Sequence, residues 1–352
     1  MRRIEYPEDF ANWPLNQQNA WLDEETARRH KAKHETRHAS DGADRGAPPI
    51  GEDDGEIVLI SAADIEPEPV RWLWRNGLQC GAFNLIAGQS TAGKSTIVLS
   101  FAATITSGGQ WPDGQSVGDP ARVVFWSGED GVKDTLLPRF LAAGGERSMM
   151  HFIEGVRDGG RKRPFDPAID MPKLTQMVQR LTDVRLIVLD PIATAVTGDS
   201  HKNVETRVGL QPFADLCMQT GACGLGVHHF TKGTAGGNPL ERVTGSLAFH
   251  ALPRCVLVAA RDQSGGWAAR RALMRAKVSN GPDWGGFDCK LDQRPLDDWP
   301  GIEAQRSFGA TQSKVRRATF SPSSRARARG RSARPLRSCA RRSRAGSEWL
   351  AR

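Results

Sequence analysis

The sequence contains no run of about eighteen apolar residues, and this absence excludes a transmembrane helix of ordinary length. Met1-Arg2-Arg3 is followed by acidic side chains from Glu5 to Asp9, not by the apolar stretch of a secretory signal. We therefore expect a soluble, cytoplasmic protein that does not use a membrane as a partner.

Closely spaced cysteines are also missing. The six cysteines are scattered without a CxxC pair, which argues against a zinc site and against the disulfide framework of a small secreted protein. We expect them to be reduced and mostly buried thiols. They are Cys80, Cys217, Cys223, Cys255, Cys289 and Cys339.

Net positive charge is lacking in residues 1–313, the part of the sequence that could build a core. Residues 314–352 hold twelve Arg and one Lys against one acid, a net charge of +12, whereas the remaining residues hold 35 basic and 39 acidic side chains. The core is therefore net negative, and its bulk charge does not indicate nucleic-acid binding. The Arg-rich end has three interpretations: a disordered basic arm that grips nucleic acid, a segment without a role, or translation in a shifted frame.

Composition predicts three parts. Residues 1–55 are polar and resemble a flexible arm with at most a short helix around Trp13 to Arg29, residues 56–300 form the main folded domain, and residues 301–352 form a disordered basic tail. In the arm, three histidines would share one face of a helix, but solvated polar faces are far commoner than metal sites. These histidines are His30, His34 and His38.

From residue 82 onward, short apolar runs alternate with helical stretches, a pattern typical of an α/β fold with a mostly parallel sheet. Predicted strands cover 82–87, 122–126, 185–189, 222–227 and 255–260, with two more near 272–278 and 287–291 at the far edge. Predicted helices cover 94–106, 132–143, 172–181 and 204–219.

One motif lies between the first predicted strand and its helix. Residues 88–95, Gly-Gln-Ser-Thr-Ala-Gly-Lys-Ser, match G-x-x-x-x-G-K-[ST], whose backbone N–H groups surround a phosphate at the N-terminus of a helix. Lys94 is expected to reach the β- and γ-phosphates of ATP, and the Ser95 hydroxyl to ligate Mg²⁺. The predicted nucleotide-binding residues are Gly88, Gln89, Ser90, Thr91, Ala92, Gly93, Lys94, Ser95 and Thr96.

Two carboxylates follow predicted strands whose carboxyl ends lie at the same edge of the sheet. Glu129 follows the strand at 122–126 and is placed to polarise the attacking water, although an acidic helix cap, for which Asp130 serves equally well, is the alternative. Asp190 ends the apolar run Leu-Ile-Val-Leu, a Walker B arrangement that holds Mg²⁺, or else forms a turn before proline.

Two adjacent histidines, His228 and His229, follow the next predicted strand. One of them is expected to approach the γ-phosphate, since neighbours on a strand point to opposite sides; the alternative is one histidine in the core and one in solvent. Polar loops beside this strand carry Lys202, Lys232 and Arg242, and these loops either grip a nucleic-acid backbone or are plain connectors.

In its order of motifs the sequence resembles the RecA/DnaB superfamily, and specifically the RepA-like hexameric helicase ATPases of plasmids and phages. The resemblance covers about residues 70–293. It rests on the phosphate loop, the strand ends at Glu129 and Asp190, the segment Val-His-His-Phe-Thr-Lys after residue 226, and Thr-Gly-Ser at 244–246 leading to Arg254.

This resemblance implies a RecA-like ATPase that binds ATP and Mg²⁺ and assembles into a homo-oligomeric, hexameric ring on single-stranded DNA. It assigns Glu129 as the catalytic glutamate, Asp190 as the Walker B acid and His229 as the γ-phosphate sensor. Arg254 and Lys277 would act on the neighbouring subunit's nucleotide, and the alternative for each is an ordinary surface ion pair.

The alternative function is a nucleotide-dependent switch or assembly ATPase of the same fold that remodels a protein partner. Fold alone does not choose between this and the DNA motor. A small-molecule kinase fits least well, because Glu129 at a strand end suits water activation.

Overall fold

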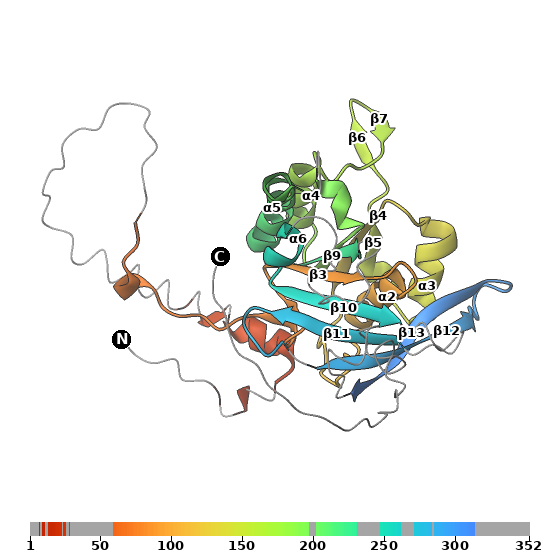
Figure 1. Cartoon of the computed structure of the whole chain (residues 1–352), viewed down its shortest axis with the longest axis horizontal. Coiled ribbons are helices and arrows are strands. Elements are labelled where there is room, and N and C mark those ends of the chain that lie inside the picture. Colours follow the sequence, from red (N-terminus) through yellow and green to blue (C-terminus); the bar gives the residue numbers. More distant parts are fainter. Residues whose placement is uncertain are drawn as a thin grey trace, which may run out of the picture.

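The computed structural model describes residues 7, 9–10, 13–22, 24–25, 28, 59–196, 202–230, 247–261, 271–283 and 285–313. Its centre is a sheet of nine strands in the order β13-β12-β11-β10-β3-β9-β8-β4-β5 (Figure 1). Strands β10, β3, β9, β8, β4 and β5 are parallel to one another, and the last three strands at the other end are antiparallel. The predicted α/β fold with a mostly parallel, RecA-like sheet is confirmed.

The parallel strands are buried on both faces, as expected for a sheet covered by helices on each side. All five strands predicted in this part are present within one or two residues of the predicted bounds. They are β3 (Phe83–Gly88), β4 (Arg122–Ser127), β8 (Val184–Asp190), β9 (Cys223–His229) and β10 (Cys255–Arg261). The sixth parallel strand, β5 (Met150–Phe152), was not predicted.

Two layers of helices cover this sheet. Helices α2 (Lys94–Ser107) and α3 (Leu137–Ala142), the latter preceded by a π-helical turn η3 (Val132–Leu136), contribute to one hydrophobic cluster. Helices α4 (Met171–Arg180) and α5 (Asn203–Thr220) contribute to a second cluster, which also contains Phe249 of the short helix α6 (Ala248–Ala251). The two clusters take alternate residues of the same strands, which shows that the molecule is a three-layer sandwich.

The sheet continues beyond the end of the domain predicted from the sequence. Strands β11 (Arg271–Val278), β12 (Gly286–Pro295) and β13 (Glu303–Ser313) pair in antiparallel order. The boundary at residue 300 is therefore corrected, and the core reaches at least Ser313. The sequence of β13 shows no apolar alternation that would mark it as a strand. Its place in the fold comes from backbone pairing with β12 and from contact with α2, where Ser100 Oγ lies 3.3 Å from both the carbonyl and the amide of Ser307.

Part of the N-terminal arm is also packed against the core. Residues 15–22 form a helix, with Leu15 and Leu22 buried. Leu15 packs against Trp72, and the Asn19 side chain donates a hydrogen bond to the Trp72 carbonyl at 3.1 Å. This helix lies within the stretch from Trp13 to Arg29 where a short helix was expected, but it packs on the core and is not part of a free arm. His30, His34 and His38 lie outside the described residues.

Several short elements were not predicted, because each has only two to four residues. Besides β5 and α6, they are η2 (Ala62–Asp64), β1 (Trp72–Trp74), β2 (Leu78–Gln79), η4 (Arg147–Met149), β6 (Val156–Asp158), β7 (Arg161–Arg163) and η5 (Ile192–Ala195). β6 and β7 form a hairpin outside the central sheet, and Figure 1 shows it projecting from the body of the molecule.

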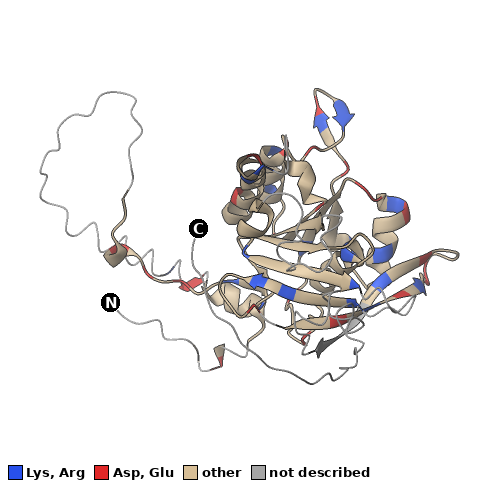
Figure 2. Cartoon of the chain, in the orientation of Figure 1, with Lys and Arg blue, Asp and Glu red and all other residues tan. Residues whose placement is uncertain are grey.

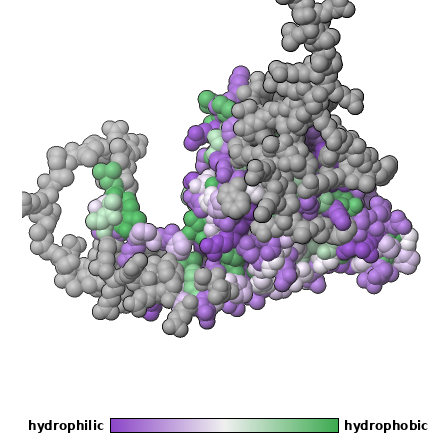
Figure 3. All heavy atoms as spheres, turned by 60° about the horizontal axis from the view of Figure 1, so that its bottom comes forward, coloured by the Kyte–Doolittle hydropathy of each residue, from purple (hydrophilic) through white to green (hydrophobic). Residues whose placement is uncertain are grey.

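The surface of the described part is mainly hydrophilic, with scattered apolar side chains, as one face in Figure 3 shows. Among the described residues, no helix combines the length and apolar character needed to cross a bilayer. No group of three His, Cys, Asp or Glu side chains suited to a metal occurs there either. Four cysteines of this part are buried and Cys80 is half-buried, all of them free; Cys339 lies outside it.

Candidate active site

The carboxyl ends of four parallel strands bring four of the six predicted catalytic residues, Lys94, Glu129, Asp190 and His229, to one edge of the sheet. Gly88 at the end of β3 is level with His229 at the end of β9, and Ser127 at the end of β4 is level with Asp190 at the end of β8. The Gly128 amide donates a hydrogen bond to the Asp190 carbonyl at 2.8 Å, which links the last two strand ends. We call this the P-loop edge. Ligands of open α/β sheets bind at this position.

The glycines of the phosphate loop are required by close packing. A Cβ on Gly88 would collide with the carbonyl of Ala259 on the adjacent strand β10. Gly93 has φ +87° at the N-terminus of α2, and a Cβ there would lie 2.7 Å from Leu291 Cδ1. The close packing at Gly88 and the positive φ of Gly93 thus fix the path by which the loop enters the N-terminus of α2, the position at which helices bind anions.

Lys94 is buried at the base of this loop. Its ammonium donates hydrogen bonds to the carbonyls of Gly88 and Gln89 at 3.2 and 3.0 Å and lies 3.0 Å from His229 Nδ1. Burial lowers the pKa of Lys94 to about 8, against the attraction of Asp190 and Glu129. A phosphate would supply the negative charge that restores the usual basicity of this amine.

Ser95 and Asp190 lie together in the arrangement expected of a magnesium site. The Ser95 hydroxyl donates a hydrogen bond to Asp190 Oδ2 at 2.7 Å, and burial raises the pKa of Asp190 to about 6 despite this bond. A hydroxyl and a carboxylate in contact are oxygen ligands of the kind Mg²⁺ prefers, and a cation would offset the cost of burying the charge. The two residues therefore fit the metal predicted from the sequence.

His229 connects Lys94 to Glu129. Because Nδ1 faces the donating ammonium of Lys94, the neutral ring carries its proton on Nε2, which lies 3.8 Å from Glu129 Oε2. Burial and the nearby Lys94 charge lower the pKa of His229, which favours this neutral form at neutral pH. The imidazole thus joins the group expected to hold phosphate to the group expected to activate water.

The adjacent histidine, His228, takes no part in this cluster. Its ring is buried on the other face of β9 and stacks on Phe249 with centroids 4.1 Å apart. The choice left open by the sequence is therefore resolved by geometry: His229 faces the P-loop edge and His228 belongs to the core.

Glu129 is positioned by a turn at the end of β4. The Ser127 hydroxyl accepts hydrogen bonds from the amides of Glu129 and Asp130 at 3.3 and 3.0 Å. The alternative role as a helix cap does not apply, since η3 begins after Gly131 with no side-chain cap, and Asp130 pairs with Arg139 at 3.2 Å. The Glu129 carboxylate remains 58% exposed, open to water.

The antiparallel strands add residues to the site that the sequence analysis missed. Leu291 of β12 packs on the phosphate loop at Gly93, and Gln305 of β13 lies 3.4 Å from the Thr96 hydroxyl. Nothing in the local sequence singles out these residues, because their place depends on strand pairing between segments about 200 positions from the loop.

Arg254 and Lys277 lie at the other end of the strands, where the parallel strands begin. We call this end of the sheet the opposite edge. The Arg254 amide donates to the carbonyl of Phe83 at the start of β3, five residues and thus about 16 Å from Gly88. Lys277 donates to the carbonyls of His250 and Ala251 at 2.9 and 2.8 Å, and burial lowers its pKa. Neither cation reaches the P-loop of its own chain.

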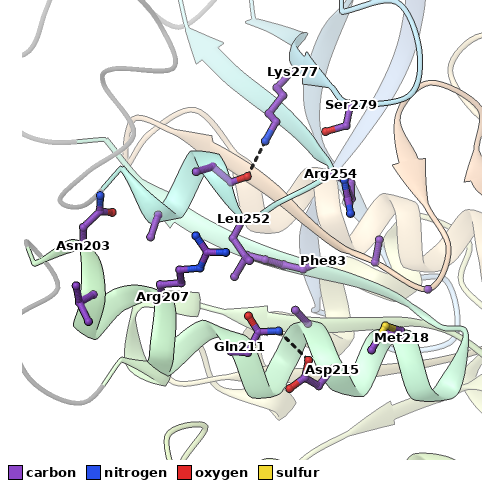
Figure 4. Close-up of a pocket in the computed structure, with 16 residues that line it drawn as sticks. Phe83, Asn203, Arg207, Gln211, Asp215, Met218, Leu252, Arg254, Lys277 and Ser279 are labelled. Atoms are coloured by element: carbon purple, nitrogen blue, oxygen red, sulfur yellow. Dashed lines mark hydrogen bonds between the residues drawn. The ribbon is translucent and has the colours of Figure 1, made fainter. Parts of the chain in front are cut away.

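Both cations line a cavity of about 630 Å³ between α5, α6 and the start of β10, which we call the α5 groove (Figure 4). Arg207 of α5 is a third cation there, and Asp215 is the acid that faces them among the lining residues. Apolar Val204 and Met218 on the α5 side are 76% and 69% exposed. The groove thus combines positive charge with uncovered apolar surface.

The polar loops beside β9 are only partly described. Lys202 precedes α5 and pairs with Glu205 at 3.0 Å. Lys232, Arg242 and the segment 244–246 lie outside the described residues.

A family model of the AAA domain, AAA_25, matches residues 49–235. No curated protein matches the chain. The matched stretch is more than half of the chain and contains the phosphate loop, Glu129, Asp190 and His229, whereas Arg254 and Lys277 fall beyond it. The chain therefore belongs to the AAA_25 family of AAA domains and is a P-loop ATPase.

Proposed function

We propose that this ATPase is a ring-forming motor that moves along single-stranded DNA, in the manner of the RepA-like replicative helicases that its sequence resembles. The observation that carries the proposal is the separation of Arg254 from the P-loop of the same chain by about 16 Å of strand. A site that needs this arginine is complete only when a second copy supplies it.

Each residue at the P-loop edge has a distinct task in hydrolysis. Lys94 binds the terminal phosphates and Glu129 accepts the proton of the attacking water. His229 lies between them, so that a change at Lys94 on phosphate release can alter the position of Glu129. An AAA domain binds nucleotide, usually with Mg²⁺; Ser95 and Asp190 would hold that ion, which neutralises developing charge on the phosphates.

Charge complementarity supports a head-to-tail assembly. The turn beyond β4 presents the acids Glu129 and Asp134 beside Lys133, with Asp130 paired to Arg139, whereas the α5 groove at the opposite edge contains Arg207, Arg254 and Lys277. Head-to-tail contacts between two different edges close into a ring when the rotation between copies closes, and we take the ring size as six from the resemblance. Bringing Arg254 to the neighbour's nucleotide would raise turnover by about 10³ or more, the usual effect of an arginine finger.

The deciding experiment is the ATPase rate of the full chain with and without single-stranded DNA. A motor couples hydrolysis to translocation, so we expect an oligothymidylate to increase the steady-state rate several-fold in low-salt buffer. Double-stranded DNA of the same length and free dTMP are the controls for structure and for phosphate charge. A rate that stays the same at saturating oligonucleotide would contradict the motor.

The same assay separates the second function class. Hydrolysis that is indifferent to DNA but dependent on protein concentration would identify a switch or assembly ATPase, which remodels a protein partner. The exposed apolar side chains of the α5 groove, Val204 and Met218, would then be its first candidate contact surface.

A further inference from the structure

The hairpin of β6 and β7 is a basic projection that neither the nucleotide site nor the α5 groove uses. It is a separate two-stranded sheet, and its second strand reads Arg161-Lys162-Arg163. Figure 2 shows Lys and Arg on both strands of the hairpin, where it projects from the body of the molecule. Arg157 on β6 adds a fourth cation.

The hairpin has a defined conformation. Its two-residue turn, Gly159-Gly160, has φ values of +53° and +81°, which suit the primed turns that match the twist of paired strands. At its base, both terminal nitrogens of Arg163 bond the Asp170 carboxylate at 2.6 Å, and the Asp170 side chain is 1% exposed. The guanidinium holds the pKa of Asp170 down to about 2, so this anchor persists across neutral pH.

The acids around the hairpin are already paired with other cations. Glu154 bonds Lys162 at 2.7 Å, and Asp158 bonds both Arg163 and Lys173, at 3.3 and 2.9 Å. Arg157 and Arg161 are exposed, and neither forms an ion pair with another residue in the described part of the chain. Arg157 is paired across the hairpin with Lys162 and Arg161 with Asp158, so the two guanidinium groups lie on opposite faces of the hairpin, one on each side of its tip.

The position of the hairpin connects it to the catalytic edge. It follows β5, which pairs with β4 at Val123–Phe125, just before the turn that carries Glu129. At the base of the hairpin, Glu154 also lies in the field of Lys133, which belongs to the π-helical turn after Glu129. The base of the hairpin is thus close to the segment that carries Glu129, whereas its tip projects from the molecule.

We propose that the β6–β7 hairpin binds the phosphodiester backbone of single-stranded nucleic acid through Arg157 and Arg161. This inference rests on the proposed DNA motor and names a binding surface for its substrate. A guanidinium matches phosphate oxygens with two parallel hydrogen bonds. The hairpin offers no exposed apolar anchor, since Val156 packs on the core, so it lacks the buried centre that a protein partner would need.

The test is the salt dependence of binding of a fluorescent oligothymidylate to the full chain. Arg157→Gln/Arg161→Gln should lower the slope of log K against log salt by about 1.4, since each phosphate that is no longer neutralised removes about 0.7 on single strands. Basal ATPase without DNA should be unchanged, because neither residue touches the nucleotide site. The matched control is Arg180→Gln, an exposed arginine at the far end of α4, which should leave the slope unchanged.

A second pair of measurements covers misfolding of the double variant. Arg157→Lys/Arg161→Lys keeps both charges and should retain most of the slope. In the unmodified protein, oligothymidylate should slow tryptic cleavage after Arg157 and Arg161 but not after Arg180. Cleavage that is equally fast with and without DNA would overturn the proposal even if the glutamine variant does not fold.

The outcomes distinguish the hairpin from the motor. If the unmodified chain binds DNA and the glutamine variant binds with the same slope, the hairpin proposal is wrong and the motor stands. If the unmodified chain neither binds DNA nor is stimulated by it, both fail together. A glutamine variant with normal DNA binding but altered sedimentation would assign the hairpin to an interface between subunits and overturn the proposal.

Discussion

The two edges of the central sheet carry charges in opposite ways. At the P-loop edge, Lys94 and Asp190 are buried, and burial moves the pKa of the amine down to about 8 and that of the acid up to about 6. At the other edge, Arg254 and Arg207 are exposed in an open groove. The buried charges of the P-loop edge would be compensated by a ligand bound to the same chain, whereas the exposed cations of the opposite edge can contact a neighbouring molecule.

This difference follows from the chemistry each edge must perform. Electrostatic attraction between the protein and a bound phosphate or metal ion is stronger when water is excluded. Without the ligand, the same buried charges lower the free energy of unfolding. A cation that acts on another molecule must stay exposed until the two meet. Breaking each edge separately should therefore produce different defects, from a large loss of turnover to small changes in stability and DNA binding.

The largest effect is expected at the P-loop edge. Lys94→Ala should lower kcat for ATP by at least about 10³, because it removes the cation that binds the terminal phosphates. Glu129→Gln should lower kcat by about 10² to 10⁴ while ATP stays bound, since only the base is removed. Steady-state turnover and equilibrium binding of a fluorescent ATP analogue measure the two effects; wild-type hydrolysis by Glu129→Gln would show that another group activates water.

The second prediction addresses the opposite edge. Arg254→Ala should lower kcat by about 10³ without preventing ATP binding, as expected of an arginine that acts on a neighbour's nucleotide. Mixtures of Lys94→Ala and Arg254→Ala chains should regain part of the activity, because some interfaces then pair an intact P-loop with an intact arginine. Arg207→Ala, an exposed cation of the same groove, is the control and should have a smaller effect.

A concentration series completes that experiment. Specific activity should rise with protein concentration as subunits assemble. A chain that sediments as a monomer and hydrolyses ATP at a constant specific rate would show that both edges work within one molecule.

The sequence predicts those parts of this contrast that depend on patterns among neighbouring residues. The phosphate loop, Glu129 and Asp190 each stand at the end of an apolar strand, and the parallel fold brings strand ends together, so their grouping follows from periodicity. The same rule explains why the predicted strands and helices of the parallel part agree with the structure. The predicted strand at 255–260 begins just after Arg254, so the same rule places this arginine at the other end of the strands from the phosphate loop.

What the sequence did not predict depends on pairing between distant segments. β13 has almost no apolar pattern, yet it pairs with β12 and touches α2, so no periodic signal marks it as part of the core. The choice between His228 and His229 required knowing which face of β9 meets Lys94. A short helix was expected near residues 15–22, but its packing on the core, with Leu15 against Trp72, was not.

A third prediction tests the strain at the P-loop edge through pH. Burial raises the pKa of Asp190 from 3.8 to about 6, so its ionised form destabilises the empty protein fully above about pH 6, and this penalty falls as the pH is lowered and is lost below the unfolded pKa. Asp190→Asn should therefore stabilise the nucleotide-free chain at pH 8 by about 3 kcal/mol, and by only about a third of this at pH 4.5. Thermal unfolding at both pH values measures this difference.

The same variant gives the functional counterpart. With Mg²⁺ and ATP present, the wild type should gain more in Tm than Asp190→Asn, since the amide cannot neutralise a cation. An Asp190→Asn chain that is no more stable at pH 8 than the wild type would indicate that the carboxylate is not strained in the empty site.

The smallest effect on catalysis is expected from the segment after Ser313, which contains none of the residues assigned to the nucleotide site. Residues 314–352 carry +12, whereas the rest of the chain carries −4, so long-range attraction to DNA should reside almost wholly after Ser313. A chain that ends at Ser313 should keep basal ATPase within about twofold and bind single-stranded DNA with a smaller salt slope, by about 0.7 for each DNA phosphate that the tail no longer neutralises.

A chain that ends at residue 302 lacks β13, whose backbone pairs with β12 and whose Ser307 touches α2, and it should unfold at lower temperature and become inactive. The comparison of the two truncations locates the end of the core: if the longer one were also without basal ATPase, part of the Arg-rich segment would have to support the P-loop edge, and if the shorter one kept it, β13 would be dispensable and residue 300 would be the functional boundary after all.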